Sequence, residues 1–261
     1  MNLGTLPFSD CLFLSDVHLG GFGHDTDRRL EHELGALIQH CTEKKIAIII
    51  LGDLFDYWME YPQLNYRPDI GDRILPLFKA YNKSIFPIPY ITGNHDHWTF
   101  GFLEEQGFRI SKDYILTKIN GSNILLCHGD GFTGAQFGLP LPLMHRILKS
   151  DAFVKWYQKI LPPQTGLKVM KAFSGWNQRF PDHNPEPLNR WAVSCLRNYD
   201  FNVIICGHDH IPRVETLSYG RYINTGAFYQ HKTLVLHKNR EFKLVTWHAD
   251  TFEFKPVHDQ L

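Results

Sequence analysis

The sequence has no long hydrophobic run and no excess of charge of one sign. No apolar stretch approaches the about 18 residues that a membrane-spanning helix needs. The first residues also lack a basic segment followed by an apolar one, so we expect no secretory signal. The 27 basic and 27 acidic side chains give a formal net charge of zero, which argues against the broad basic surface that duplex nucleic acid requires. We therefore expect a cytoplasmic protein that does not have nucleic acid as its partner.

Cysteine is also scarce. The five cysteines lie far apart and none belongs to a CxxC pair, which excludes a structural zinc knuckle. Their apolar surroundings predict reduced thiols in a cytoplasmic core, and none has a nearby catalytic partner. With 261 residues, 43% of them hydrophobic, the chain can bury a large core, and we expect a single α/β domain over residues 1–261.

The sequence does contain five short apolar runs that end at polar residues. The run from Ile46 to Leu51 leads into Gly52-Asp53, which predicts a strand buried on both faces and ending at a carboxylate. The other four runs lead into Asp16-Val17-His18, Gly93-Asn94-His95-Asp96, His128-Gly129-Asp130 and Gly207-His208-Asp209-His210. Because ligands bind outside the carboxyl ends of strands in open α/β sheets, we expect these residues to form one site.

The residues at these strand ends are metal-ligand types. Residues two apart on an extended segment point to the same side, so Asp16 with His18, and His208 with His210, can each present a pair of ligands. Carboxylates, an amide and imidazoles without thiolates suit manganese, iron or zinc. Seven ligands exceed the needs of one ion and suit two ions that share a carboxylate, as in displacement at phosphorus. The seven are Asp16, His18, Asp53, Asn94, His128, His208 and His210.

The order and spacing of these motifs resemble the calcineurin-like metallophosphoesterases. Within that superfamily, the stretches at residues 15–19 (SDVHL) and 52–58 (GDLFDYW) look like those of the bacterial UDP-2,3-diacylglucosamine diphosphatases of lipid A synthesis. The resemblance implies an α/β fold, a two-sheet αββα sandwich. The chain departs from the narrower group at His95, where the best-known lipid A hydrolases usually carry arginine.

The resemblance also implies roles for the strand-end residues. One ion would be held by Asp16, His18, Asp53 and His210, and the second by Asp53, Asn94, His128 and His208. A hydroxide between the ions would attack phosphorus, His95 would stabilise or protonate the leaving oxygen, and Asp96 would orient a histidine. We expect two divalent cations, manganese first, with iron or zinc as alternatives.

Residues 132–190 distinguish this chain from a minimal phosphoesterase. The segment begins with glycine and proline turns, continues with helical patterns, one of them over 167–180, and carries eight basic against three acidic residues. It can be an ordinary amphipathic helical pair with a solvated basic face. It can also be a helical cap over the metal site, whose apolar side holds acyl chains and whose Lys149, Lys155 and Lys159 meet a diphosphate or an anionic membrane.

Four functions are consistent with these patterns. We favour hydrolysis of UDP-2,3-diacylglucosamine to UMP and 2,3-diacylglucosamine 1-phosphate, by a protein that contacts the cytoplasmic face of the inner membrane peripherally. A phosphodiesterase or nuclease would need basic and aromatic residues along an open groove. The remaining alternatives are a general phosphomonoesterase and a metal-binding scaffold without catalysis.

Secondary structure is predicted around these motifs. A helix is expected with Asp25 or Thr26 as its N-cap and an apolar stripe that extends to Cys41. Further helices are expected over 70–83 and over 188–197, and a hairpin at Asn120-Gly121. The alternating segments after residue 212 are expected to be antiparallel strands that close a second sheet.

Overall fold

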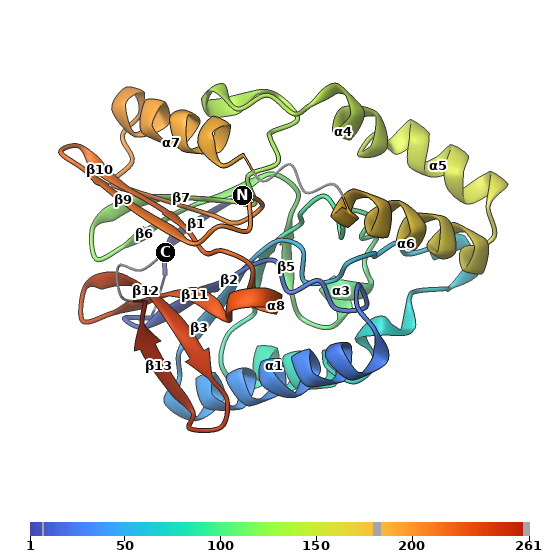
Figure 1. The fold of residues 1–261 in the computed structure, drawn as a ribbon, viewed down its shortest axis with the longest axis horizontal. Coiled ribbons are helices and arrows are strands. Elements are labelled where there is room, and N and C mark those ends of the chain that lie inside the picture. The colour runs from blue at the N-terminus through green and yellow to red at the C-terminus, as the bar shows by residue number, and fades with distance from the viewer. Residues whose placement is uncertain (7, 180–183, 258–261) are drawn as a thin grey trace.

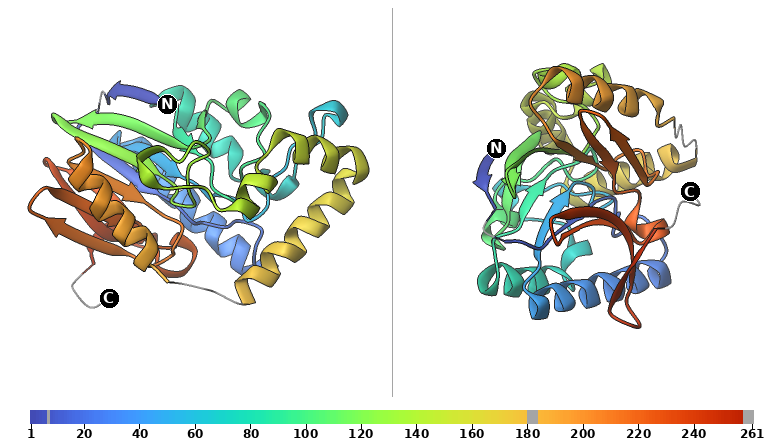
Figure 2. Two further views of the ribbon diagram at one scale, coloured as in Figure 1. Left: turned by 90° about the horizontal axis from the view of Figure 1, so that it is seen from above. Right: turned by 90° about the vertical axis from the view of Figure 1, so that its left-hand side faces the viewer.

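Two β-sheets form the centre of the protein in a computed structural model, which describes residues 1–6, 8–179 and 184–257 (Figures 1 and 2). The first sheet has six strands, in the order β1 (Asn2–Thr5), β6 (Tyr114–Ile119), β7 (Ser122–Cys127), β8 (Val203–Cys206), β10 (Gly220–Asn224) and β9 (Arg213–Leu217). The second has seven, in the order β13 (Glu253–Pro256), β12 (Glu241–His248), β11 (Thr233–Lys238), β2 (Cys11–Leu14), β3 (Ala47–Leu51), β4 (Pro89–Ile91) and β5 (Arg109–Ser111).

The two sheets pack face to face, and helices cover their outer faces. Phe13 and Ile49 of the second sheet share a buried cluster with Leu126 and Ile205 of the first. Helix α7 (Glu186–Asn198) packs on the outer face of the first sheet, and helices α1 (His24–Lys44) and α2 (Leu75–Ser84) pack on the second. The predicted two-sheet αββα sandwich is therefore confirmed.

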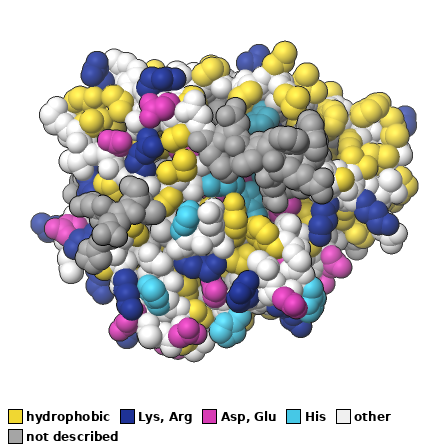
Figure 3. Space-filling model, in the orientation of Figure 1, with side chains coloured by type: hydrophobic (Ala, Val, Ile, Leu, Met, Phe, Trp, Pro, Cys, Tyr) yellow, Lys and Arg dark blue, Asp and Glu magenta, His cyan; other side chains and the backbone are white. Residues whose placement is uncertain are grey.

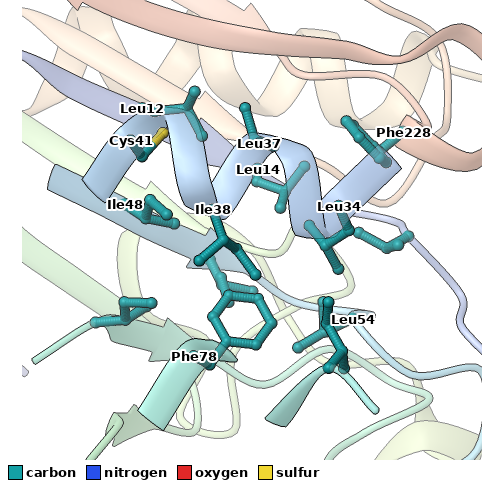
Figure 4. Packing of buried hydrophobic residues seen from close by; sticks show 14 of the residues in the cluster. Leu12, Leu14, Leu34, Leu37, Ile38, Cys41, Ile48, Leu54, Phe78 and Phe228 are labelled. Atoms are coloured by element: carbon teal, nitrogen blue, oxygen red, sulfur yellow. The ribbon is translucent and has the colours of Figure 1, made fainter. Parts of the chain in front are cut away.

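Helix α1 shows why the amphipathic pattern predicted its position. Its buried stripe consists of Leu30, Leu34, Leu37, Ile38 and Cys41, and these side chains lie on Leu12, Leu14 and Ile48 of the sheet (Figure 4). The N-cap is Gly23, two residues before the predicted Asp25, because the carbonyl of Gly23 accepts hydrogen bonds from the backbone N–H groups of Thr26 and Asp27.

The prediction that all the last strands close a second sheet is wrong. Strands β9 and β10 extend the first sheet, where β10 runs parallel to β8, and only β11, β12 and β13 join the second. The predicted hairpin at Asn120-Gly121 does join β6 to β7. Alternation of polar and apolar residues predicts a strand but not the sheet it joins, because either sheet can bury its apolar face.

Three helices of the 132–190 segment project from the sandwich. These are α4 (Leu143–Leu148), α5 (Asp151–Ile160) and α6 (Pro163–Arg179), which Figure 2 shows extending beyond the sheets. We call α4–α6 the helical insert. The predicted end of the 167–180 helix, Phe180, lies outside the described residues. No helix in the described ranges has the length and apolar character needed to cross a bilayer. The short helices are α3 (Phe102–Glu105), α8 (Phe228–His231), η1 (Pro62–Leu64), η2 (Asp69–Gly71) and η3 (Gln136–Gly138).

Candidate metal centre

The five motif strands end at one edge of the sandwich, but they belong to different sheets. Strands β2, β3 and β4 carry Asp16, Asp53 and Asn94 from the second sheet, and β7 and β8 carry His128 and His208 from the first. Backbone hydrogen bonds connect the loops within each sheet, from the N–H of Asp16 to the carbonyl of Gly52 (3.1 Å) and from Gly207 to His128 (2.9 Å). The site therefore lies between two sheets rather than at the end of one.

One group of ligand atoms surrounds Asp16. Its Oδ1 lies 3.3 Å from Nε2 of His210 and 3.8 Å from Nε2 of His18. The same nitrogen of His18 lies 3.8 Å from Oδ2 of Asp53. Atoms that bind one ion with bonds of about 2.1 Å are separated by about 3 to 4.2 Å. These distances therefore fit a shared cation.

A second group surrounds Asp53. Oδ2 of Asp53 lies 3.2 Å from Nε2 of His128, which in turn lies 3.2 Å from Oδ1 of Asn94. Ligand atoms of Asp16, Asp53 and His128 all lie within 4.8 Å of one another. Because Asp53 lies close to His18 on one side and to His128 on the other, it is placed where a carboxylate can bridge two ions.

The electrostatics of the cluster also fit a cation. Nε2 of His18 and Nε2 of His210 are only 3.3 Å apart, a separation that needs a proton or a cation between the two lone pairs. Although burial opposes the charged form, hydrogen bonds to Asp16 and Asp56 raise the pKa of His18 to about 10. Burial also opposes ionisation of Asp53, but the neighbouring His128, His95 and His18 hold its pKa well below the usual range. A divalent cation would replace the proton that these carboxylates attract.

The backbone at the site is strained in a way that the sequence did not indicate. Five of the seven predicted ligands have left-handed φ angles between 51° and 75°, which cost non-glycine residues of the order of 1–3 kcal/mol each. They are Asp16, His18, Asp53, His208 and His210. Such conformations cluster at sites where function requires a particular side-chain direction, and here they turn side chains at the strand ends toward one another.

Glycine is required beside the ligands because the ligand side chains leave no room for a Cβ. A Cβ on Gly52, whose φ is +96°, would lie 2.5 Å from Nδ1 of His128, and a Cβ on Gly93 would collide with Oδ1 of Asp53. A glycine beside a metal ligand can let the chain approach an ion closely. The structure shows that Gly52 and Gly93 make room for the ligand side chains themselves.

His208 lies next to His128 and Asp16 at this centre. Its ring centroid is 5.0 Å from that of His128, and its backbone N–H donates a 3.0 Å hydrogen bond to Oδ2 of Asp16. Burial, together with the neighbouring His128, lowers the pKa of His208 to about 4. The neutral imidazole that results is the form that binds metals.

His95 and Asp96 occupy different positions at the site. A nitrogen of His95 forms a group within 4.8 Å with ligand atoms of His18 and Asp53, and its ring is half-buried at the cavity described below. Asp96 was predicted to orient a histidine. Within the described residues its hydrogen bonds come instead from the N–H groups of Leu54 (2.8 Å) and Gly93 (2.7 Å) and from the Tyr90 hydroxyl, so it holds the loop backbone.

Asp56, which sequence reasoning missed, is the carboxylate beside the Nδ1 atoms of His18 and His95. Its Oδ1 lies 3.1 Å from Nδ1 of His18 and 3.6 Å from Nδ1 of His95, and its carbonyl lies 2.8 Å from that same nitrogen of His95. Asp56 therefore fixes the ring orientation of both histidines. Its position in the stretch Gly52-Asp53-Leu54-Phe55-Asp56 was the available signal.

A cavity of about 470 Å³ connects the centre to the helical insert. Asn94 and His95 line one end, and apolar side chains from the insert line the other; these include Met144, Leu148, Phe153, Tyr157, Val169 and Met170. Of the predicted substrate-binding lysines, Lys149 lines this cavity. Lys155 and Lys159 are exposed on α5 and do not line it.

A comparison with family models identifies the fold's relatives. The model described as calcineurin-like phosphoesterase matches residues 11–212. The chain belongs to the calcineurin-like phosphoesterase family. The superfamily prediction is thereby confirmed, and the chain is a metal-dependent phosphoester hydrolase.

Within this family, the chain is similar to proteins named UDP-2,3-diacylglucosamine hydrolase. A protein of Porphyromonas gingivalis named UDP-2,3-diacylglucosamine hydrolase is 32% identical over 263 aligned positions, which cover 90% of this chain and 99% of that one. A protein of the same name from Aeromonas hydrophila is 23% identical, with coverage of 89% and 96%. Similarity to this named group is therefore confirmed. Among solved structures, the phosphoesterase Yfce from E. coli has a TM-score of 0.46 and 12% identity, with coverage of 94% and 96%.

Proposed function

We propose that the protein hydrolyses UDP-2,3-diacylglucosamine to UMP and 2,3-diacylglucosamine 1-phosphate. The observation that carries this proposal is the cavity, which begins at Asn94 and His95 and continues under the apolar side chains of the insert. A lipid-linked nucleotide needs both features, a centre for its diphosphate and an apolar space for its acyl chains. Relatives that carry the name of this activity support the substrate.

Two divalent cations, manganese first, would be held by the strand-end residues. In this proposal Asp16, His18, Asp53 and His210 hold one ion, and Asp53, Asn94, His128 and His208 hold the other. When bound, such ions supply an activated hydroxide and offset negative charge on phosphoryl oxygens. Support comes from the distances around Asp16 and Asp53 and from the fully buried carboxylates.

The remaining residues handle protons and orientation. His95, half-buried at the cavity and oriented by Asp56, stabilises or protonates the leaving oxygen. Asp56 also holds the ring of His18 through Nδ1, so that Nε2 points toward Asp16 and Asp53. Asp96 holds the loop that carries Asn94 and His95 through backbone hydrogen bonds.

We also propose that the insert contacts the cytoplasmic face of the inner membrane. Apolar side chains of α4 and α5 are exposed, with Leu143 at 71%, Met144 at 63% and Trp156 at 58%. Figure 3 shows apolar side chains gathered over the end of the molecule that the insert forms, with basic side chains beside them. Exposed Lys155 and Lys159 on α5 would meet anionic headgroups while the apolar side chains enter the bilayer.

The test compares substrates that separate the alternatives. Manganese-loaded protein is assayed on UDP-2,3-diacylglucosamine, bis-p-nitrophenyl phosphate, p-nitrophenyl phosphate and single-stranded DNA. We expect the highest kcat/KM for the lipid nucleotide, and a lower value when the acyl chains are removed or when Phe153 in the cavity wall is changed to aspartate. Activity on the generic diester or DNA alone would contradict the lipid substrate and retain the metal chemistry.

A further inference from the structure

The cavity contains a positive charge that the metal centre does not use. Lys149 directly follows α4, and its side chain reaches the loop after β7, where Nζ lies 2.5 Å from Oδ2 of Asp130. Both side chains are buried, at 8% and 4% exposure. Lys149 lines the cavity, whereas Asp130 is not among its lining residues, so the ion pair lies at the cavity wall.

Two histidines accompany this lysine on the same wall. His145, one turn earlier on α4, has Nδ1 3.8 Å from the same oxygen of Asp130, and His97 follows the Asn-His-Asp motif. Burial lowers the pKa of both, that of His97 to about 3, and the nearby Lys149 ammonium lowers them further. Both rings are therefore neutral at pH 7 and leave Lys149 as the local positive charge.

A diphosphate ester has two charged phosphoryl groups, whereas a phosphate diester has one. If the metal centre binds the phosphoryl group that is attacked, the other group needs a second positive charge nearby. Among the described residues that line the cavity, Lys149 is the one lysine or arginine. Its ammonium has three donors, of which Asp130 needs one. Asp130 thereby keeps the ammonium in place while other donors remain for a ligand.

We propose that Lys149, positioned by Asp130, binds the phosphoryl group of a diphosphate substrate that is not attacked, and so selects diphosphates over phosphate diesters. The inference rests on the proposed diphosphatase function for its reaction class. It does not depend on the uridine or the acyl chains.

The experiment measures kcat and KM separately on three substrates. These are UDP-2,3-diacylglucosamine, P1,P2-bis(p-nitrophenyl) diphosphate and bis-p-nitrophenyl phosphate. Because a hydrogen bond to a charged group contributes about 1.5–3 kcal/mol, we expect Lys149→Met to lower the ratio of diphosphate to diester kcat/KM by roughly 10- to 100-fold, mainly through KM. Lys149→Arg should restore most of the ratio, and Lys83→Met, an exposed lysine on α2, serves as the matched control.

Asp130 is tested as a positioning residue. Asp130→Asn should raise KM for both diphosphates, as Lys149→Met does. In the double variant it should add little to the effect of Lys149→Met, because Asp130 acts only by orienting the Lys149 ammonium. Metal content, measured by mass spectrometry, should stay at the wild-type value. Lys149→Gln repeats the test if the methionine variant does not fold.

The outcomes separate this inference from the proposed substrate. If the ratio is unchanged, whether all three activities fall together or none falls, Lys149 does not select diphosphates and the inference is wrong. If the wild-type protein ignores the lipid nucleotide but hydrolyses the generic diphosphate in a Lys149-dependent manner, the proposed substrate is wrong and the inference holds.

Discussion

The metal centre is buried, whereas the helical insert exposes large apolar side chains to solvent. At the centre, Asp16, Asp53 and His128 are at most 1% exposed, and backbone hydrogen bonds from both sheets fix the loops that carry them. In the insert, Leu143 and Trp156 leave more than half of their surface in solvent. The candidate metal ligands therefore lie on buried strand ends, whereas the insert presents exposed side chains outside the core.

The two regions are nevertheless connected by side chains. The indole N–H of Trp98 donates to the carbonyl of Leu148 (3.0 Å), and the amide of Gln158 donates to the carbonyl of Glu60 (2.7 Å). With the Lys149–Asp130 ion pair, these bonds hold the insert over the cavity. The comparison therefore predicts large chemical effects from the centre and selective, smaller effects from the insert.

Asp53→Asn should have the largest effect. Asp53 is the carboxylate that both ligand groups share, so its loss should remove metal and lower kcat by roughly 10³-fold, or about 4 kcal/mol of transition-state stabilisation. The measurement is the hydrolysis rate of bis-p-nitrophenyl phosphate together with manganese content. Asp25→Asn, at an exposed carboxylate on α1, is the control. Wild-type metal content and activity in Asp53→Asn would show that Asp53 is not a ligand shared by two ions.

Asp56→Asn should have the next largest effect, because it removes the negative charge that holds Nδ1 of His18 without removing a ligand. Such outer contacts typically contribute 10- to 100-fold in metal affinity or activity, and we expect a loss of about that size. The measurement is the rate as a function of manganese concentration. An unchanged concentration dependence would show that His18 does not need the Asp56 carboxylate.

Much of the centre could be predicted from the sequence, and the reason is local. Each ligand lies within about four residues of the end of its strand, so a short apolar run followed closely by Asp, Asn or His indicates its position without long-range information. Asp56 was missed because it lies three residues beyond Asp53, and its contact with His95 depends on how two loops pack. Likewise, the pattern of Arg213–Leu217 predicts a strand but cannot show that β9 joins the first sheet.

His97→Gln should change stability in acid. Burial, aided by Lys149 and Lys112, lowers the pKa of folded His97 to about 3, while the unfolded chain takes up the proton below about pH 6.5. The unfolded state therefore binds more protons, and stability falls as the pH drops from 6.5 toward 3. Between pH 6.5 and 5 the metal-free wild-type protein should lose about 2 kcal/mol more than His97→Gln in urea unfolding. Equal losses would show that His97 is not held neutral.

Exposed residues of the insert should affect stability least. Trp156→Ser and Ile160→Ser, both more than half exposed, should change the free energy of unfolding by no more than about 0.5 kcal/mol. Both variants should bind vesicles containing anionic lipid less than the wild-type protein does, because the insert would lose apolar side chains that enter the bilayer. Phe252→Ser, 40% exposed outside the insert, is the matched control. Unchanged vesicle binding would show that this face does not contact the membrane.

Anomalous diffraction from crystals of the manganese-loaded protein would locate the ions themselves. We expect two manganese peaks about 3.5–4 Å apart, both in contact with Asp53. One peak should be bound by Asp16, His18 and His210, and the other by Asn94, His128 and His208. A single peak, or peaks away from these residues, would contradict the two-ion centre.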